Sequence, residues 1–303
     1  MSETQQSMNP SRHFDELPDA PPKRKIRLSW SGKLGIAVLV FWAIIVVIGP
    51  SISPYHEAEF LEESLFIVPG SDEKYPDTDF QPPSRIVLLG SDYMGRDTLS
   101  RILFGARTTI GISFIATILA YLIGVTLGIA AAVGYRFQYR GFTIIELDTV
   151  LSRLNDALLS IPSIMLGLVM IAALGSTIPL LIVLTGIIYA ASVFRIARSL
   201  GQEVMVSDFV EAARVRGEGL WWIITREILP NVAMPLATDF GLRFVWVILF
   251  ISALSFLGLG VQPPMSDWGS MVKENLPGLI YGSVAPLVPS LAIATLTISV
   301  NMI

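Results

Sequence analysis

The chain has 303 residues, of which 52% are hydrophobic and only 15% are charged, and its mean hydropathy is +0.63. Soluble domains carry about 25% charged residues, so this composition indicates that lipid is the solvent of much of the chain. The net charge of −4 gives no basic field for nucleic acid, and the absence of cysteine excludes disulfides, thiolate metal sites and a cysteine nucleophile.

The first 28 residues are polar and proline-rich, and they end in a basic run at 23–27. No small-residue cleavage pattern follows the apolar run at 34–49, so we expect a retained first span rather than a cleaved signal peptide. Residues 1–31 are therefore predicted to be a disordered cytoplasmic tail. Both histidines, His13 and His56, lie in polar segments, which excludes a histidine-based metal site or proton relay inside the expected spans.

Apolar runs that cross a bilayer as helices need roughly twenty residues. We expect an all-α membrane protein with six transmembrane helices, at residues 32–52, 107–134, 156–174, 177–197, 232–261 and 277–303. Residues 53–106 then form an extracytoplasmic segment, and residues 107–303 form a five-helix core. Glycines in the second span suit close contact between helices; they are Gly111, Gly124, Gly128 and Gly134.

Orientation follows from lysine and arginine near the span ends, because cytoplasmic loops carry an excess of these cations. With the N-terminal tail inside, the cations that fall on the cytoplasmic side are Lys23, Arg24, Lys25, Arg27, Lys33, Arg136, Arg140, Arg153, Arg195, Arg198, Arg214, Arg216 and Arg226. The segment at 53–106 is acidic instead. An even number of spans returns the C-terminus to the cytoplasm.

A polar, helix-forming segment at 208–230 separates the fourth expected span from the fifth. Asp208 and Glu211 have the spacing of a capping-box-like pair, and Gly217 stands where a left-handed C-terminal cap is wanted. Pro230 is expected to end a second short helix before the next span begins. The structural alternative is an amphipathic helix among the lipid headgroups, and the functional one is a docking element for a cytoplasmic partner.

The spacing within this segment is specific. The triplet Glu211-Ala212-Ala213 is followed after three residues by Gly217, and Leu229-Pro230 begins twelve residues later. This pattern resembles the Glu-Ala-Ala (EAA) loop of ATP-binding-cassette importer permeases, the element through which a cytoplasmic ATPase moves the membrane subunit. Residues 201–231 are identified as this loop by the resemblance.

Two further stretches narrow the resemblance. Residues 89–107 read LGSDYMGRDTLSRILFGAR, which is similar to the LGTDxxGRDxxSRxxxGAR signature of the dipeptide, oligopeptide and nickel permeases. Residues 256–264 read FLGLGVQPP and are followed by Trp268, Gly269 and Met271, as in the segment after the fifth span of that family. The C-type subunit fits best because the outside segment before the core is short.

The same residues also have plain structural interpretations. Gly90, Asp92 and Gly95 are turn residues, and Asp97 can cap the helix that carries Arg101. For residues 262–264 and Trp268, a turn or an aromatic belt at the membrane interface is expected rather than contact with substrate.

The resemblance implies the type I importer permease fold with a cytoplasmic coupling helix, in a multi-pass protein of the bacterial inner membrane with both termini in the cytoplasm. The residues expected to couple to the ATPase are Glu211, Ala212, Ala213, Arg214, Arg216, Gly217, Leu229 and Pro230. The resemblance implies a Gly-Asp-Gly-Leu-Arg-Asp-like cytoplasmic tail after the sixth span, which the residues up to 303 do not include.

The resemblance also implies four protein partners, namely a second homologous permease, two ATPase subunits and an extracytoplasmic solute-binding protein, together with membrane lipid. No Gly-x-x-x-x-Gly-Lys-Ser/Thr loop occurs in the chain, so ATP and Mg are expected on the ATPase subunits. We expect that the chain is not an enzyme and that it binds no cofactor or metal. Peptides are the expected cargo, with nickel chelates or opine-like solutes as alternatives.

Ionisable residues inside spans are functional hypotheses by default. Asp239 and Arg243 are four residues apart, so they share one helix face, and Asp148, Arg153 and Asp156 precede the third expected span. An ion-coupled secondary carrier or channel would use such groups, and it is the alternative function. We expect both sets to pair structurally at the cytoplasmic ends of their helices.

Overall fold

The computed structural model describes residues 29–62, 78–134 and 144–303. Within these residues the chain is helical, and its β pairing there is one isolated bridge between Ser91 and Asp97. The helices in chain order are α1 (Trp30–Ile52), α2 (Thr98–Gly134), α3 (Ile144–Leu159), α4 (Ser163–Leu174), α5 (Ile178–Met205), α6 (Asp208–Val215), α7 (Leu220–Trp222), the π-helical η3 (Ile223–Ile228), α8 (Leu229–Phe256), α9 (Trp268–Asn275), the 3₁₀-helical η4 (Leu276–Tyr281) and α10 (Leu287–Asn301).

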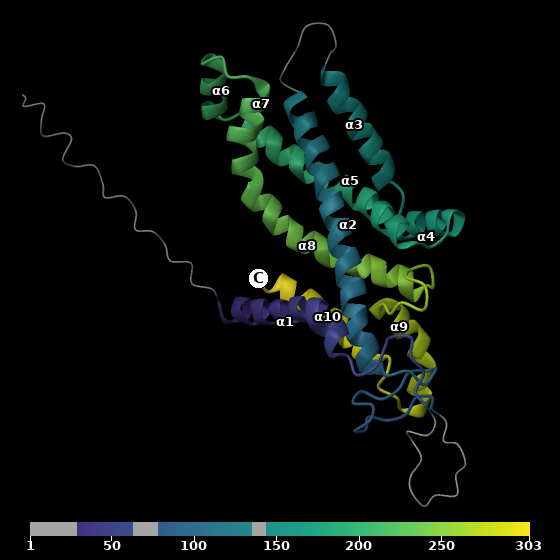
Figure 1. Ribbon diagram of the computed structural model, residues 1–303. Helices are drawn as coiled ribbons and strands as arrows, with labels where there is room; N and C mark the ends of the chain where they lie inside the picture. The colour runs from purple at the N-terminus through teal and green to yellow at the C-terminus, as the bar shows by residue number, and fades with distance from the viewer. Residues whose placement is uncertain (1–28, 63–77, 135–143) are drawn as a thin grey trace, which may run out of the picture.

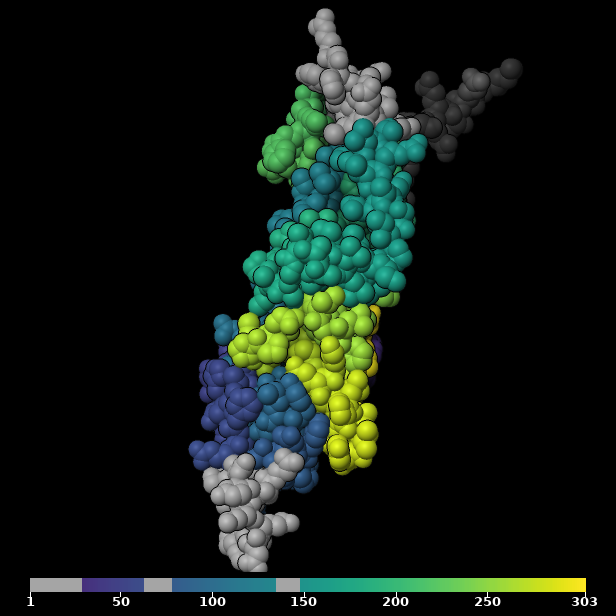
Figure 2. Space-filling model, turned by 90° about the vertical axis from the view of Figure 1, so that its right-hand side faces the viewer, coloured from purple at the N-terminus to yellow at the C-terminus, as the bar shows by residue number. Residues whose placement is uncertain are grey.

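The molecule is elongated along α2 (Figure 1). α6 and α7 lie at one end of α2, and α9 lies at the other end together with the chain that joins α1 to α2. Figure 2 shows the same separation on the surface, with the green α6 region at one end and the yellow C-terminal helices toward the other. The expected tail at 1–28, the acidic stretch at 63–77, and Arg136 and Arg140 lie outside the described residues.

Four helices are long and apolar enough to cross a membrane: α1, α2, α5 and a continuous helix from Leu220 to Phe256. α3 and α4 form a fifth candidate span if they are counted together, although they meet at 84°. The expected single helix at 156–174 is therefore wrong in its detail, because the helix breaks before Ser163. Pro162 explains the break, since it lacks an N–H and disfavours helical backbone at the residue before it.

The last expected span, 277–303, is also divided. The 3₁₀ helix η4 ends at Gly282, whose φ of 72° is left-handed. α10 then begins at Leu287 and has 15 residues, fewer than the roughly twenty that a helix needs to cross a bilayer alone. The structure thus confirms the all-helical class and gives four or five candidate membrane spans in the described part of the chain.

α2 begins nine residues before the expected start at 107, because a cap fixes its first turn. The Asp97 carboxylate accepts hydrogen bonds from the Ser100 backbone N–H at 2.8 Å and from the Ser100 hydroxyl at 2.5 Å. This confirms the capping role expected for Asp97. The helix has 37 residues, about 55 Å at 1.5 Å per residue, so it extends beyond the bilayer.

α2 and α5 pack closely where glycine removes the side chain. A methyl group at Gly124 would lie 2.6 Å from Val193, and one at Gly128 would lie 2.7 Å from the Phe194 carbonyl oxygen. Small residues at a helix interface allow this backbone approach within a membrane. The expectation is therefore confirmed for these two glycines, but not for Gly111, where no neighbouring atom lies within 4 Å.

Three clusters of buried apolar side chains lie along α2. The α9-end core gathers Ile102, Leu103 and Ala106 of α2 with residues of α1, α8, α9 and α10. A middle core joins α2 to α4, α5 and α8. The α6-end core gathers Ile129 and Val133 of α2 with α5, α6, η3 and the start of α8. α2 is thus common to all three.

The α2–α5 contact gives a direct test. We expect Gly128→Ala to destabilise the protein by about 1–3 kcal/mol, because the added methyl meets rigid α5 backbone rather than a movable side chain. Gly111→Ala is the matched control on the same helix and should cost nothing measurable. Unfolding of both variants in detergent, followed by circular dichroism, compares them; equal stability would contradict the packing argument.

Candidate functional site

The first candidate site is the segment at 208–230, whose first half is α6. Ser207 is the N-cap residue and makes no side-chain capping bond, so the expected capping box that begins at Asp208 is wrong by one position and is not formed. Asp208 and Glu211 lie in the first helical turn instead, where negative charge is stabilised by the helix dipole. Glu211 pairs with Arg214 at 3.6 Å, three residues along the helix.

The C-terminal cap of α6 forms as expected around Gly217. This glycine has a φ of 85°, and its N–H donates to the Arg214 carbonyl at 2.8 Å. The next N–H, that of Glu218, donates to the Ala213 carbonyl at 3.1 Å. These two bonds satisfy carbonyl groups that the end of a helix leaves without a partner. They form because the backbone at Gly217 is left-handed.

Pro230 does not end the second helix, contrary to expectation. The helix runs without a break from Leu220 to Phe256, and Pro230 lies in the first turn of α8. A π-helical stretch at Ile223–Ile228 precedes it, in which the Leu229 N–H donates to the Ile224 carbonyl. The wider turn accommodates a proline, which has no N–H to place in an α-helical ladder.

The π-helical turn also sets which side chains face inward. Ile223 and Ile228 are both fully buried in the α6-end core. Residues five apart point about 140° away from each other in a regular α-helix. The five-residue hydrogen-bond step of the π turn brings them to one face. η3 therefore places both isoleucines in the α6-end core.

α6 buries one face and exposes the other. Val210 and Ala213 are fully buried in the α6-end core, so Ala213 contributes packing and presents no surface. Phe209, Ala212 and Val215, at helical spacing, are exposed and form an apolar stripe, with Val215 83% exposed. Of the residues expected to couple, those exposed are Glu211, Ala212, Arg216, Gly217, Leu229 and Pro230, whereas Arg214 is partly buried.

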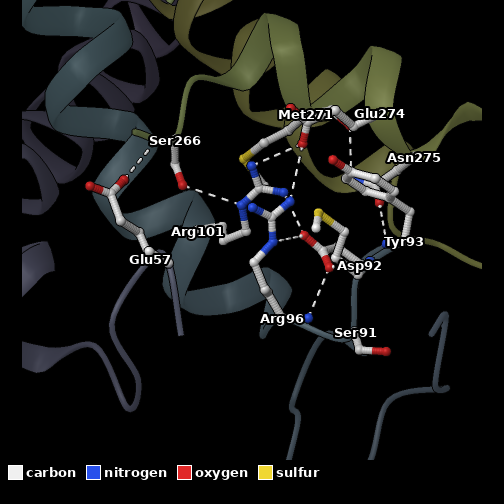
Figure 3. Close-up of polar contacts among 12 residues, drawn as sticks. Glu57, Ser91, Asp92, Tyr93, Arg96, Arg101, Ser266, Met271, Glu274 and Asn275 are labelled. Carbon is white, nitrogen blue, oxygen red and sulfur yellow. Dashed lines mark hydrogen bonds and ion pairs between the residues drawn. The ribbon is translucent and has the colours of Figure 1, made fainter. Parts of the chain in front are cut away.

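A buried charge cluster lies at the other end of α2 (Figure 3). We define it as Asp92, Arg96, Arg101 and Glu274. Asp92 is fully buried and accepts from Arg96 Nε at 2.7 Å and Arg101 Nη1 at 2.5 Å. Glu274 accepts from Arg101 Nη2 at 3.0 Å and from Arg96 Nη2 at 3.3 Å. Two cations and two anions thus balance each other.

The charge cluster joins three parts of the chain. Arg101 Nε donates to the Ser266 hydroxyl at 3.3 Å, and the Ser266 N–H donates to the Glu57 carboxylate at 2.6 Å. The Tyr93 N–H donates to Asn275 Oδ1 at 3.0 Å. The turn interpretation of the 89–107 motif is therefore incomplete. Its arginines hold α9, and sequence spacing could not have indicated Glu274 as their partner.

Trp268 is fully buried, so the expectation of an interfacial belt residue is wrong. Its indole N–H donates to the Ile102 carbonyl at 3.1 Å, and its ring meets the Trp42 ring at 4.8 Å. The absence of a side chain at Gly105 makes room for it, because a methyl group there would lie 2.9 Å from the indole. The FLGLGVQPP-W motif thus serves helix packing at this position.

Asp267, which precedes Trp268, is a polar residue that the sequence argument missed. It caps α9 by accepting from the Ser270 N–H at 3.1 Å, and it accepts from the Thr109 hydroxyl at 2.9 Å. Burial raises the pKa of its carboxyl group. Burying the charged Asp267 carboxylate destabilises the fold. As the pH falls through the folded-state pKa the carboxyl group becomes protonated, and this destabilisation is lost. An Asp directly before a helix is the N-cap signal that could have indicated this role.

Of the five ionisable residues near membrane depth, Asp148, Asp239 and Arg243 are in ion pairs. Arg243 Nη2 lies 3.1 Å from Asp239 Oδ1, as the four-residue spacing predicted. Asp148, however, pairs with Arg198 of α5 through contacts of 2.6 and 2.7 Å, and not with its sequence neighbours. In the described part of the chain, no three His, Asp or Glu side chains are grouped closely enough to hold a metal ion.

Comparison with known proteins gives a consistent result. Residues 124–303 match the family described as binding-protein-dependent transport system inner membrane component. A Brucella suis protein provisionally named a peptide transport system permease is 36% identical over 74% of this chain and 72% of its own length. The glutathione transport system permease GsiD of Pectobacterium atrosepticum is 32% identical over 78% of this chain and 77% of its own. The dipeptide transport system permease DppC of Alkalihalophilus pseudofirmus is 32% identical over 76% of this chain and 73% of its own length.

The charge cluster makes a quantitative prediction. Asp92→Asn should lower the free energy of unfolding by about 3–5 kcal/mol, because it leaves a buried guanidinium without its counter-charge. Glu274→Gln should cost less, since the Glu274 side chain is 16% exposed and water replaces part of the interaction. The exposed Glu59→Gln is the control. Denaturant unfolding in detergent measures all three, and similar losses for Asp92 and Glu59 would contradict the assignment.

Proposed function

Because this chain belongs to the family of binding-protein-dependent transport system inner membrane components, we propose that it forms part of the translocation pathway for peptides. It is a transmembrane subunit of an ATP-binding-cassette importer. The peptide assignment rests on the names of the relatives, which cover peptides, dipeptides and glutathione. A nickel chelate or an opine-like solute is the alternative cargo.

Cargo is tested on the solute-binding protein that delivers it. We expect the cognate binding protein, purified and mixed with candidate ligands, to bind short peptides with free termini in titration calorimetry. Binding of a nickel chelate or an opine in place of peptides would overturn the peptide assignment and would leave the importer assignment standing.

The proposed assembly has this chain beside a second homologous permease, with two ATPase subunits at the α6 end and a binding protein at the α9 end. ATP and Mg are bound by the ATPase subunits, and this chain catalyses no reaction. The proposed topology has six spans in the bacterial inner membrane, with the α3–α4 pair as the third and α10 as the core of the sixth. Both termini then lie in the cytoplasm.

Coupling to the ATPase is proposed to pass through α6. The exposed stripe of Phe209, Ala212 and Val215 offers an apolar surface at the end of the molecule, and Glu211 and Arg216 flank it with charge. The buried side of α6 packs on α2, α5 and α8 through the α6-end core. A displacement of α6 by a closing ATPase therefore moves those helices with it, as expected for a two-state element biased by nucleotide.

Gly217 carries the test of this proposal. Gly217→Val forces a β-branched residue into left-handed backbone, at a cost of about 1–2 kcal/mol, and we expect ATPase binding to weaken by about tenfold with a matching loss of import. Gly219→Val is the matched control, because Gly219 has a φ of −74° and open space around it. Co-purification with the ATPase and ATP-dependent peptide uptake in proteoliposomes are the measurements.

Normal import by Gly217→Val would contradict coupling through this segment. Uptake driven by an ion gradient without ATP would support the carrier alternative instead.

A further inference from the structure

A polar contact between α2 and α8 lies within the membrane-spanning part of the protein. The Tyr121 hydroxyl of α2 donates to Asp239 Oδ2 of α8 at 2.5 Å. The other oxygen of the same carboxylate accepts from Arg243 Nη2 at 3.1 Å. We call these three residues the α2–α8 clasp. Ionised groups inside a span are expensive and are retained where they are paired, so the clasp is a costly way to join two helices.

On both α2 and α8, the clasp lies between the residues of the α6-end core and those of the α9-end core. On α2, Tyr121 lies between Ala106 of the α9-end core and Ile129 of the α6-end core. On α8, the ion pair lies between Leu236 of the α6-end core and Phe244 of the α9-end core. The clasp therefore sits between the part of each helix that packs with α6 and the part that packs with α9.

Aromatic rings surround the clasp, and a cavity adjoins it. The Tyr121 ring meets the Phe240 ring edge-on at 5.0 Å, and Phe240 in turn meets Phe114 of α2 at 6.0 Å. On the α6 side, a cavity of about 650 Å³ opens between α2 and the α7–α8 segment, and its lining includes Tyr121, Phe240, Trp221 and Leu229. The hydroxyl–carboxylate bond is thus a polar link between the two helices beside this cavity.

We propose that Tyr121, Asp239 and Arg243 are positioning residues that hold α2 and α8 together, so that displacement of α6 moves both helices as one. The proposal rests on the proposed function, since it concerns how motion introduced at α6 reaches the α9 end. Packing of apolar side chains also holds two helices in register, and the clasp adds to it a contact between particular polar atoms. A charged hydrogen bond is directional and shorter, so it fixes the two helices in one register.

Tyr121→Phe is the sharpest test, because it removes one oxygen atom and leaves the Asp239–Arg243 ion pair intact. Tyr189→Phe is the matched control: it also removes one hydroxyl from a spanning helix, and its bond is to the Trp246 carbonyl. The full importer, reconstituted in liposomes with its ATPases and binding protein, is measured for ATP hydrolysed per peptide imported. We expect this ratio to rise at least threefold for Tyr121→Phe and to stay at the wild-type value for Tyr189→Phe.

A wild-type ratio of ATP hydrolysed to peptide imported in Tyr121→Phe would overturn the clasp. If the melting temperature of this variant is also lower, the hydroxyl has a structural role alone. If its KM for peptide is raised instead, the residues contact the cargo.

A second variant covers failure of Tyr121→Phe to assemble. Asp239→Asn combined with Arg243→Gln removes both charges together, so neither is left unpaired in the membrane, and the same rise in ratio is expected. A wild-type ratio in this double variant would also overturn the clasp. If the wild-type importer takes up no peptide with ATP, the proposed function fails and the clasp fails with it, whereas failure of the clasp alone leaves wild-type import intact.

Discussion

Gly124 and Gly128 leave α2 without side chains at two places, and there an added methyl group would lie less than 3 Å from atoms of α5. Every other helix packs directly or indirectly on this pair. The three buried cores all contain α2 residues, and the two nearer α6 also contain α5 residues. In lipid, where apolar burial gives little drive for helices to associate, such close packing is the main source of cohesion.

Among the buried charged residues that the structure describes, Asp92, Arg96, Arg101 and Asp148 are in ion pairs, whereas Asp97 and Asp267 accept hydrogen bonds. The charge cluster balances two guanidinium groups with two carboxylates. Asp148 meets Arg198 across two helices, and Asp239 meets Arg243 along one helix. Because an unpaired charge is costly in a medium of low dielectric, each of these contacts fixes a specific arrangement of segments. Lipid contact alone would leave that arrangement free.

The two ends of the molecule differ in how they are held. The α9 end is held by hydrogen bonds and ion pairs around Arg101 and Trp268, both fully buried. The α6 end is held by apolar packing of Val210, Ala213 and Ile223, with an exposed apolar stripe on the outer side of α6. The α9 end thus combines an apolar core with buried polar contacts, whereas the α6 end presents apolar side chains at its surface.

Local signals in the sequence identified the family, the helical class and several element ends correctly. The Asp97 cap, the left-handed Gly217 and the Asp239–Arg243 pair all follow from residues within four positions of one another, so their geometry is set by one turn of chain. The pattern of apolar residues does not show where a proline bends a helix, so the break before Ser163 was missed. A π-helical turn has no recognisable sequence pattern, so the continuation through Pro230 was missed as well.

What the sequence determined by itself was therefore the lipid solvent, the helices and the local turns. The tertiary structure alone decided the partners of distant residues. Glu274 meets Arg101, Arg198 meets Asp148, and Tyr121 meets Asp239. The physical reason is that composition and spacing report the cost of burying a charge, whereas the partner that offsets that cost depends on which helices lie side by side.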